Sequence, residues 1–168
     1  MRNIISIANQ KGGVGKTTTA ISLAAALAET GKKILLIDAD PQGNATSGVG
    51  INKHDIRSNN LYHALIGTAD AMDVIVDTAF PCLQLMPSNQ DLIGVEVEFV
   101  SMKDREHRLK NAINTIDSVH DYIIIDCPPS LGFLTVNSLV ASDSLIIPLQ
   151  CEYFALEGLG QLLNTVKL

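Results

Sequence analysis

A glycine-rich segment near the amino terminus has the residue types that bind phosphate groups. It runs from Gln10 to Thr18 with the sequence QKGGVGKTT. Its glycines allow positive φ and close approach of the backbone, so that successive N–H groups can surround an anion. Lys16 would reach the β- and γ-phosphates of a nucleotide, and the hydroxyl of Thr17 would complete the shell of a Mg²⁺ ion. The common phosphate-loop pattern requires glycine where this chain has Gln10, so only Gly15, Lys16 and Thr17 follow that pattern.

Aspartates that follow apolar segments could complete such a site. Asp38 follows Ile34–Ile37, and Asp126 follows Tyr122–Ile125. Ligands of an open parallel sheet bind beyond the carboxyl ends of its strands, so both carboxylates are predicted to face the phosphate loop and to hold Mg²⁺. Asp40, two residues beyond Asp38, is predicted to orient or deprotonate water at the γ-phosphate. The alternatives are solvated strand ends for Asp38 and Asp126, and an aspartate that only begins a turn for Asp40.

Particular elements must position these residues. Ile4–Ala8 is a short, mostly β-branched run and predicts a buried strand before the loop. The helical spacing of Ala and Leu over Thr17–Glu29 predicts a helix after it. The apolar run Ile34–Ile37 completes a strand–helix–strand unit of the parallel kind. The predicted fold class is therefore α/β, with a mostly parallel sheet flanked by helices on both faces.

The rest of the chain continues the same alternation. The predicted strands are Leu83–Met86, Tyr122–Asp126 and Leu145–Leu149, and the predicted helices are Leu61–Ile66, Ala71–Val76, Lys103–Val119, Leu131–Ala141 and Ala155–Leu168. The segment Asp40–Asn60 is predicted to be irregular because it is rich in Gly, Asn and Pro. The last helix has no Gly, Pro or cap to close it. We therefore expect one domain over residues 1–168 that the chain's end cuts short.

Composition excludes several classes of protein. The 168 residues carry 12 Lys and Arg against 18 Asp and Glu, a net charge of −6, which gives no chain-wide basic surface for nucleic acid. A hydrophobic content of 46% excludes a disordered chain. No apolar run is long enough to span a membrane, and the polar Gln10–Gly13 interrupts what could be a signal peptide. We therefore expect a cytoplasmic protein.

The cysteines and histidines favour no further site. Neither set has the spacing of a disulfide framework or a metal site. The cysteines are therefore expected to be reduced and mostly buried, and the histidines to have no catalytic role. These residues are Cys82, Cys127 and Cys151, and His54, His63, His107 and His120.

Longer motifs resemble one family of nucleotide-hydrolysing proteins. The loop Lys11–Thr18 resembles the deviant Walker A box of P-loop NTPases of the ParA/MinD superfamily. The segments Asp38–Thr46, Asp126–Ser130 and Gln150–Leu159 together resemble chromosome-partitioning ParA proteins of the Soj type. The resemblance covers the whole chain as the amino-terminal two thirds of the family's domain. The family's last strands, adenine-contacting loop and basic DNA-binding surface would lie beyond it.

The resemblance implies ATP and Mg²⁺ as cofactors and assigns roles to single residues. Lys11 would reach across a nucleotide-sandwich dimer to the partner's phosphates. The residues predicted to contact the nucleotide are Lys11, Gly12, Gly13, Val14, Gly15, Lys16, Thr17 and Thr18. The residues predicted at the metal are Thr17, Asp38 and Asp126, with Asp126 behind the direct ligands, and those predicted to act in catalysis are Lys11, Lys16 and Asp40.

The function that the resemblance implies is an ATPase used as a switch in chromosome or plasmid partitioning. ATP would close a homodimer that binds non-specific DNA on the nucleoid, and a ParB-type centromere-binding partner would stimulate hydrolysis and release. No membrane is involved in this hypothesis. The alternatives are a MinD-like membrane-associated ATPase of division-site placement, which needs a carboxyl-terminal amphipathic helix, and a truncated fragment without catalysis. A nitrogenase iron protein with Cys127 at its cluster is disfavoured by the following Pro128–Ser130.

Overall fold

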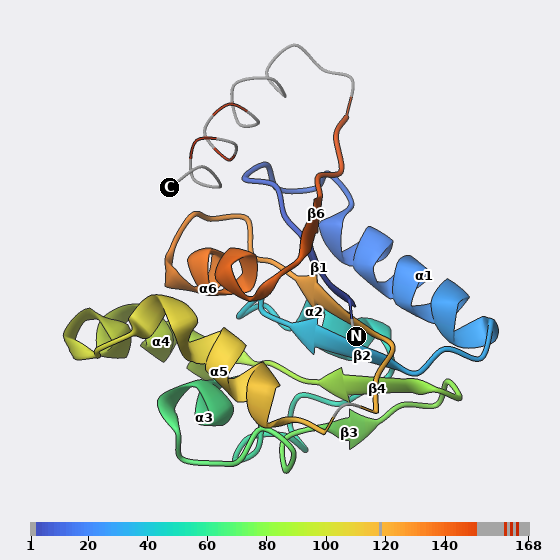
Figure 1. Ribbon diagram of the computed structural model, residues 1–168, viewed down its shortest axis with the longest axis horizontal. Coiled ribbons are helices and arrows are strands. Elements are labelled where there is room, and N and C mark those ends of the chain that lie inside the picture. The colour runs from blue at the N-terminus through green and yellow to red at the C-terminus, as the bar shows by residue number, and fades with distance from the viewer. Residues whose placement is uncertain (1–2, 118, 151–159, 161, 163, 165–168) are drawn as a thin grey trace.

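A mixed sheet forms the centre of the molecule. The computed structural model describes residues 3–117, 119–150, 160, 162 and 164. Within them, strands pair in the order β3-β4-β2-β5-β1-β6, and helices lie on both faces of the sheet (Figure 1). Every pair is parallel except β3 with β4, which is antiparallel. The predicted α/β class with a mostly parallel sheet is therefore confirmed.

The elements have the following bounds. The strands are β1 (Asn3–Ile7), β2 (Ile34–Asp38), β3 (Val76–Asp77), β4 (Leu83–Met86), β5 (Tyr122–Asp126) and β6 (Ser144–Ile146). The α-helices are α1 (Lys16–Glu29), α2 (Asn44–Gly48), α3 (Leu61–Ile66), α4 (Val95–Glu98), α5 (Arg108–Thr115) and α6 (Phe133–Ala141). The 3₁₀ turns are η1 (Gln90–Gly94), η2 (Phe99–Ser101) and η3 (Arg105–His107).

The central strands are buried on both faces, as their continuous apolar runs predict. Successive side chains of a strand point to opposite faces. Leu35 and Ile37 of β2 therefore pack on the side of α3, α4, α5 and α6, whereas Ile34 and Leu36 pack against α1 and α2. All four side chains are fully buried. This double packing holds the strand ends in place.

The register of the sheet brings the two strand-end aspartates together. Asp38 of β2 pairs with Asp126 of β5, and Ile7 of β1 pairs with Asp126 on its other side. Backbone bonds continue past the strand ends, where the Ala39 N–H donates to the Asp126 carbonyl at 2.9 Å and the Cys127 N–H donates to the Ile7 carbonyl at 3.1 Å. The carboxyl ends of β1, β2 and β5 thus form one edge, where the phosphate loop begins.

Two predictions of local structure are wrong. Ala71–Val76, predicted as helical, forms a turn and then enters β3, because Val76 pairs with Leu85 of β4 and this pairing outweighs a weak helical spacing. Asp40–Asn60, predicted as irregular, contains α2, which follows Gly43 at φ +60°. A glycine there provides the left-handed turn that starts the helix.

Other predicted elements are shorter than expected. The helix predicted over Lys103–Val119 is interrupted, since Asp104 has φ +54° and Ile116 is extended. The strand predicted over Leu145–Leu149 ends at Ile146. The helix predicted over Ala155–Leu168 lies outside the described residues, except for three of its positions. Among the described residues, no helix is both long and apolar enough to cross a bilayer.

Candidate functional site

The glycine-rich loop joins β1 to α1, and most of its backbone N–H groups make no hydrogen bond within the described residues. Gly13 and Gly15 have φ of +74° and +89°, and Gly15 precedes α1 without a side-chain cap. The backbone N–H groups from Gly12 to Thr18 donate to no other described residue. Such donors, together with the positive end of a helix, form an anion-binding site. The loop geometry therefore fits the phosphate-binding role predicted for it.

Lys16 is held inside this loop. It is only 7% exposed, and its ammonium donates to the Lys11 carbonyl at 3.1 Å. Burial lowers the pKa of Lys16, and the negative charges of Asp126 and Asp40 oppose that shift. The ammonium of Lys16 lies close enough to the carboxylates of Asp126 and Asp40 to feel their charge. A bound phosphate would add further negative charge beside the ammonium and favour its charged form.

Asp126 is a buried carboxylate at the end of β5 with the Thr17 side chain nearby. It is fully buried, and neither oxygen accepts a hydrogen bond of ordinary geometry from a described residue. Burial raises its pKa to about 7, the Thr17 side chain opposes the rise, and the charges of Asp38 and Asp40 add to it. A buried acceptor without donors is costly unless a cation compensates it. The side chain therefore fits a Mg²⁺ ion beside Thr17.

Asp38 differs from Asp126 although both end an apolar strand. One oxygen of Asp38 accepts the N–H and the hydroxyl of Thr46, each at 2.7 Å, and the other accepts the Asp40 N–H at 3.2 Å. Burial raises the pKa of Asp38 to about 6, against these bonds. Asp38 thus anchors the segment that carries Asp40. Its predicted place at the metal remains a prediction.

Asp40 lies at the same edge and also begins a turn. It is 7% exposed, and its Oδ1 accepts the Gln42 N–H at 2.9 Å. Its carbonyl accepts the Gly43 N–H at 2.9 Å and the Ser88 hydroxyl at 2.6 Å. Oδ2 makes no hydrogen bond among the described residues, which leaves one oxygen for water. Both roles considered for Asp40 are thus compatible with its geometry.

Lys11 lies on the outer side of the loop. Its N–H donates to Asn9 Oδ1 at 3.0 Å, and the Asn9 amide donates to the Pro148 carbonyl at 2.8 Å. Its ammonium donates to Gln150 Oε1 at 3.4 Å. The asparagine therefore fixes the start of the loop against the segment after β6. The predicted reach of Lys11 to a partner's phosphates stays a prediction.

Three residues of the site were missed by the sequence analysis. Asn9 fixes the loop, and Thr46 and Ser88 connect β2 to β4, with the Ser88 N–H donating to the Thr46 hydroxyl at 3.0 Å. Ser88 follows β4 as Asp38 ends β2, so the rule for strand ends could have found it. Thr46 lies eight residues from its partner Asp38, and the sequence carries no local signal for that bond.

The structure describes no protein-only metal cage. Among its described residues, no group of three His, Cys, Asp or Glu side chains is arranged to hold a metal ion. Mg²⁺ commonly binds through one or two carboxylates together with substrate phosphates. Asp126 and Thr17 fit that manner of binding.

The prediction for the cysteines is half right. Cys127 is buried, and burial raises its pKa to about 12, so this thiol is inert. Cys82 is exposed at φ +63° in the turn before β4, contrary to the expectation of mostly buried thiols. Cys151 lies outside the described residues.

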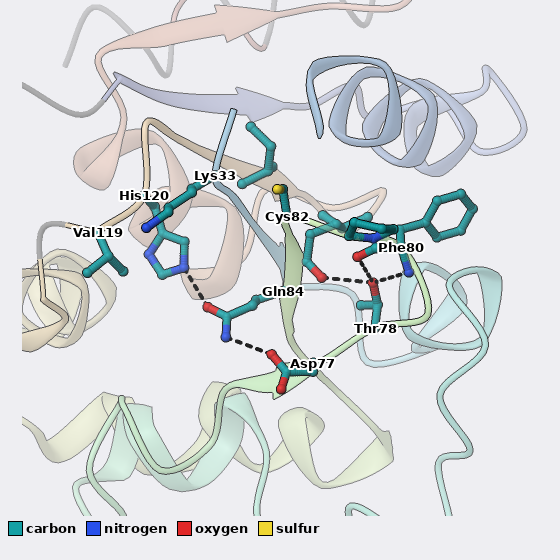
Figure 2. A pocket seen from close by; sticks show the side chains of 11 residues that line it. Lys33, Asp77, Thr78, Phe80, Cys82, Gln84, Val119 and His120 are labelled. Carbon is teal, nitrogen blue, oxygen red and sulfur yellow. Dashed lines mark hydrogen bonds between the residues drawn. The ribbon is translucent and has the colours of Figure 1, made fainter. Parts of the chain in front are cut away.

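A groove of about 600 Å³ lies at the opposite end of the sheet, by the amino ends of β2 and β4 (Figure 2). His120 and Gln84 lie 2.8 Å apart through Nε2 and Oε1, and the Gln84 amide donates to Asp77 at 2.9 Å. The Thr78 hydroxyl donates to the Leu83 carbonyl at 2.8 Å. Ligands of parallel sheets bind at the other end, and these side chains bond to one another, so this groove is not our candidate site.

Comparison with known proteins identifies the family to which the fold and the glycine-rich loop point. A family model described as an AAA domain matches residues 2–168. The chain is 56% identical over 168 residues to the sporulation initiation inhibitor protein Soj of Bacillus subtilis, and 54% identical over 165 residues to the chromosome partitioning protein ParA of Myxococcus xanthus. These alignments cover 100% and 98% of this chain but 66% and 58% of the relatives, so the chain spans less than two thirds of either.

A solved structure is also similar. It is that of cobyrinic acid a,c-diamide synthase from Mycobacterium smegmatis, with bound ADP and magnesium. The TM-score is 0.95 at 42% identity, over 99% of this chain and 67% of that one. The fold described above is therefore one that holds a magnesium nucleotide in a related protein.

Proposed function

The chain belongs to the ParA/Soj-type family of AAA-domain P-loop ATPases, and on this premise we propose that residues 1–168 are one ATPase domain of a partitioning switch. The observation that carries the proposal is the buried Asp126 carboxylate, whose oxygens accept no hydrogen bond of ordinary geometry from a described residue and which lies at the strand edge near Thr17 and Lys16. In a magnesium nucleotide, the Mg²⁺ ion would supply positive charge to the Asp126 carboxylate, and the phosphates would supply negative charge to the Lys16 ammonium. The switch would work in the cytoplasm, on the nucleoid.

The loop would bind and orient the nucleotide. The open N–H groups from Gly12 to Thr18 would hold the phosphates, and the ammonium of Lys16 would exchange the Lys11 carbonyl for phosphate oxygens. Thr17 and Asp126 would hold Mg²⁺, which when bound supplies positive charge at the phosphates. Asp40 would accept a hydrogen bond from the attacking water through Oδ2, because Oδ1 is already committed to the Gln42 N–H.

The proposal extends to a homodimer. Two lysines five residues apart exceed the need of one nucleotide, because Lys16 and the backbone donors already neutralise much of the phosphate charge. Lys11, on the outer side of the loop, would contact the nucleotide of a second copy across a two-fold interface. The ATP-bound dimer would bind non-specific DNA, and a ParB-type partner would stimulate hydrolysis and release it.

Two substitutions at Asp40 test the hydrolytic step. In the whole protein, Asp40→Asn keeps an oxygen for the Gln42 N–H but removes the charge, whereas Asp40→Ala removes both. We expect both variants to bind ATP at parental affinity and to hydrolyse it on the order of 100-fold more slowly in single-turnover assays. Parental hydrolysis by Asp40→Asn would show that Asp40 is only a turn residue.

Substitution of Lys11 tests the dimer. Lys11→Ala should keep monomeric nucleotide binding and lose ATP-dependent dimerisation, and with it DNA binding. Sedimentation with a slowly hydrolysed ATP analogue, at one fixed salt concentration, measures the dimer. Lys32→Ala, a change of another exposed lysine at the far end of α1, is the matched control. A normal dimer in the Lys11→Ala variant would exclude action across the interface.

A further inference from the structure

A second polar groove lies beside the segment that carries Asp40. It has a volume of about 550 Å³, and its basic lining consists of Lys53, His54 and Arg57. The side chains of Gln42, Asn89 and Gln90 also line it. Because residues 89 and 90 follow β4 and residue 42 follows β2, the groove opens at the carboxyl edge of the sheet, as the glycine-rich loop does, but on a different pair of strands.

The groove is locally basic in an acidic protein. The chain has a net charge of −6 with histidine neutral, yet the charged side chains that line the groove are Lys53 and Arg57 against Asp91 alone. The N–H of Asp91 donates to Asn89 Oδ1 at 2.9 Å, so the amide nitrogen of Asn89 remains a donor to the groove. A surface with this charge and these donors selects anions.

One hydrogen bond fixes the protonation pattern of the basic cluster. Arg57 Nη2 lies 2.9 Å from His54 Nδ1. Arginine has no acceptor, so Nδ1 accepts and Nε2 carries the ring hydrogen. The cluster therefore presents donors from three side chains: the Lys53 ammonium, the Arg57 guanidinium and the His54 Nε2–H. Donors from three side chains, two of them charged, match the oxygens of a phosphate group.

Lys53 connects the groove to Asp40. Its ammonium donates to the Gln42 carbonyl, and the Gln42 N–H donates to Asp40 Oδ1 at 2.9 Å. Its stem lies against Gly43, where an added Cβ would be 2.9 Å from Lys53 Cε and 2.7 Å from the Ser88 carbonyl. An anion that attracts the Lys53 ammonium would therefore compete with the Gln42 carbonyl for it.

We propose that this groove binds a phosphate group, as a free anion or as part of a nucleic-acid backbone, and that binding draws Lys53 away from Gln42. The site is separate from the glycine-rich loop and does not depend on the proposed ATPase function. Any effect on hydrolysis would rest on that function, because it would pass through the turn at Asp40.

Residue-resolved NMR of the chain tests the proposal, because it separates the two anion sites. Inorganic phosphate and, in a second titration, a short DNA duplex are added at constant ionic strength. Signals of His54 and Arg57 report on the groove, the amides of Gln42 and Gly43 report on the turn, and the Gly15 amide reports on the loop. We expect saturable shifts at all four groove and turn residues with at least one of the two probes.

Matched variants decide whether the groove is specific. Arg57→Gln removes one exposed charge-assisted donor and should weaken binding about tenfold. Lys110→Gln, an equal change of charge at an exposed position of α5, should leave it unchanged. Saturation by phosphate alone identifies a free-anion site, and saturation by DNA alone identifies a backbone site. Absence of saturable shifts with both probes, or equal weakening by both variants, would overturn the proposal whatever the Gly15 amide does.

Discussion

The two ends of the sheet differ in how their polar side chains are arranged. At the amino ends of β2 and β4, side chains bond to one another, as in the chain from His120 through Gln84 to Asp77 (Figure 2). At the carboxyl ends, Asp126 is fully buried and neither of its oxygens accepts a hydrogen bond of ordinary geometry from a described residue, while the buried Lys16 lies near the charges of Asp126 and Asp40. Both ends are polar, but only the second gathers several buried charged groups, Lys16, Asp38, Asp40 and Asp126.

This difference identifies the functional end on physical grounds. Buried carboxylates without donors destabilise a fold, so they persist where a ligand compensates them. Polar groups that pair with one another need no ligand. We therefore expect the end that gathers buried charge to be the end that binds, and the cost of that charge to the free energy of unfolding can be measured.

The largest effect is expected for Lys16→Ala. The lysine is a point charge for the phosphates and contributes little to the apolar core, so nucleotide affinity should fall about 100-fold or more while the fold remains. Calorimetric titration with a slowly hydrolysed ATP analogue measures affinity, and circular dichroism monitors the fold. Lys33→Ala, at the amino-end groove, should bind normally. Unchanged affinity in the Lys16→Ala variant would refute the assignment of the loop.

The next effect is on stability. Without Mg²⁺ at pH 8, Asp126→Asn should raise the free energy of unfolding by about 2 kcal/mol, since it removes a buried charge whose pKa is raised from 3.8 to about 7. Asp77→Asn at the amino end, an exposed position bonded to Gln84, should change it by less than about 0.5 kcal/mol. Urea unfolding compares the two. If Asp126→Asn is no more stable than the parental chain, the buried Asp126 charge does not destabilise the fold, and the prediction is wrong.

The gain from Asp126→Asn should depend on pH. A carboxyl group whose pKa is raised on folding binds a proton more tightly in the native state, so its stabilisation is present below about pH 4 and is lost as the pH rises to about 7. The difference between variant and parental chain should therefore grow by about 2–3 kcal/mol between pH 5 and pH 8. The measurement is a series of urea titrations without Mg²⁺. A difference that shrinks as the pH rises would contradict the raised pKa.

The smallest effect is expected at the amino end. Gln84→Leu breaks the bonds to His120 and Asp77 and should cost about 1 kcal/mol of unfolding free energy, with nucleotide affinity unchanged. Thermal unfolding and the same calorimetric titration give both quantities. A loss of affinity in this variant would mean that the two ends of the sheet are coupled.

The strands that have long apolar runs in the sequence could be predicted from it. The apolar runs of β2 and β5 end at Asp38 and Asp126, and parallel pairing aligns these ends, so both aspartates could be placed at one edge before the structure was known. The two-residue strand β3 was not predictable, because residues 76 and 77 become a strand only by pairing with β4. Periodicity within the segment gives no information about that neighbour.

The sequence placed the two strand-end aspartates together but could not distinguish their hydrogen-bond partners. Asp38 and Asp126 follow the same sequence pattern, yet only Asp38 receives the Thr46 donors. That bond depends on the turn at Gly43, which brings α2 back over the end of β2. The pattern of an apolar strand ending in aspartate cannot distinguish Asp38, which anchors a loop through Thr46, from Asp126, which we propose binds near a cation.

The hydrogen bonds that join Asp38, Thr46 and Ser88 also make local opening of this segment measurable by hydrogen exchange. The amide hydrogen of Thr46 is held by a buried carboxylate, and that of Ser88 by the Thr46 hydroxyl. Both residues are fully buried, so each amide can exchange with deuterated water only while the segment from Asp38 to Ser88 is open. The protection of these two amides against exchange therefore reports the free energy of opening the segment that carries Asp40, and equal opening free energies would indicate that both ends of it open together.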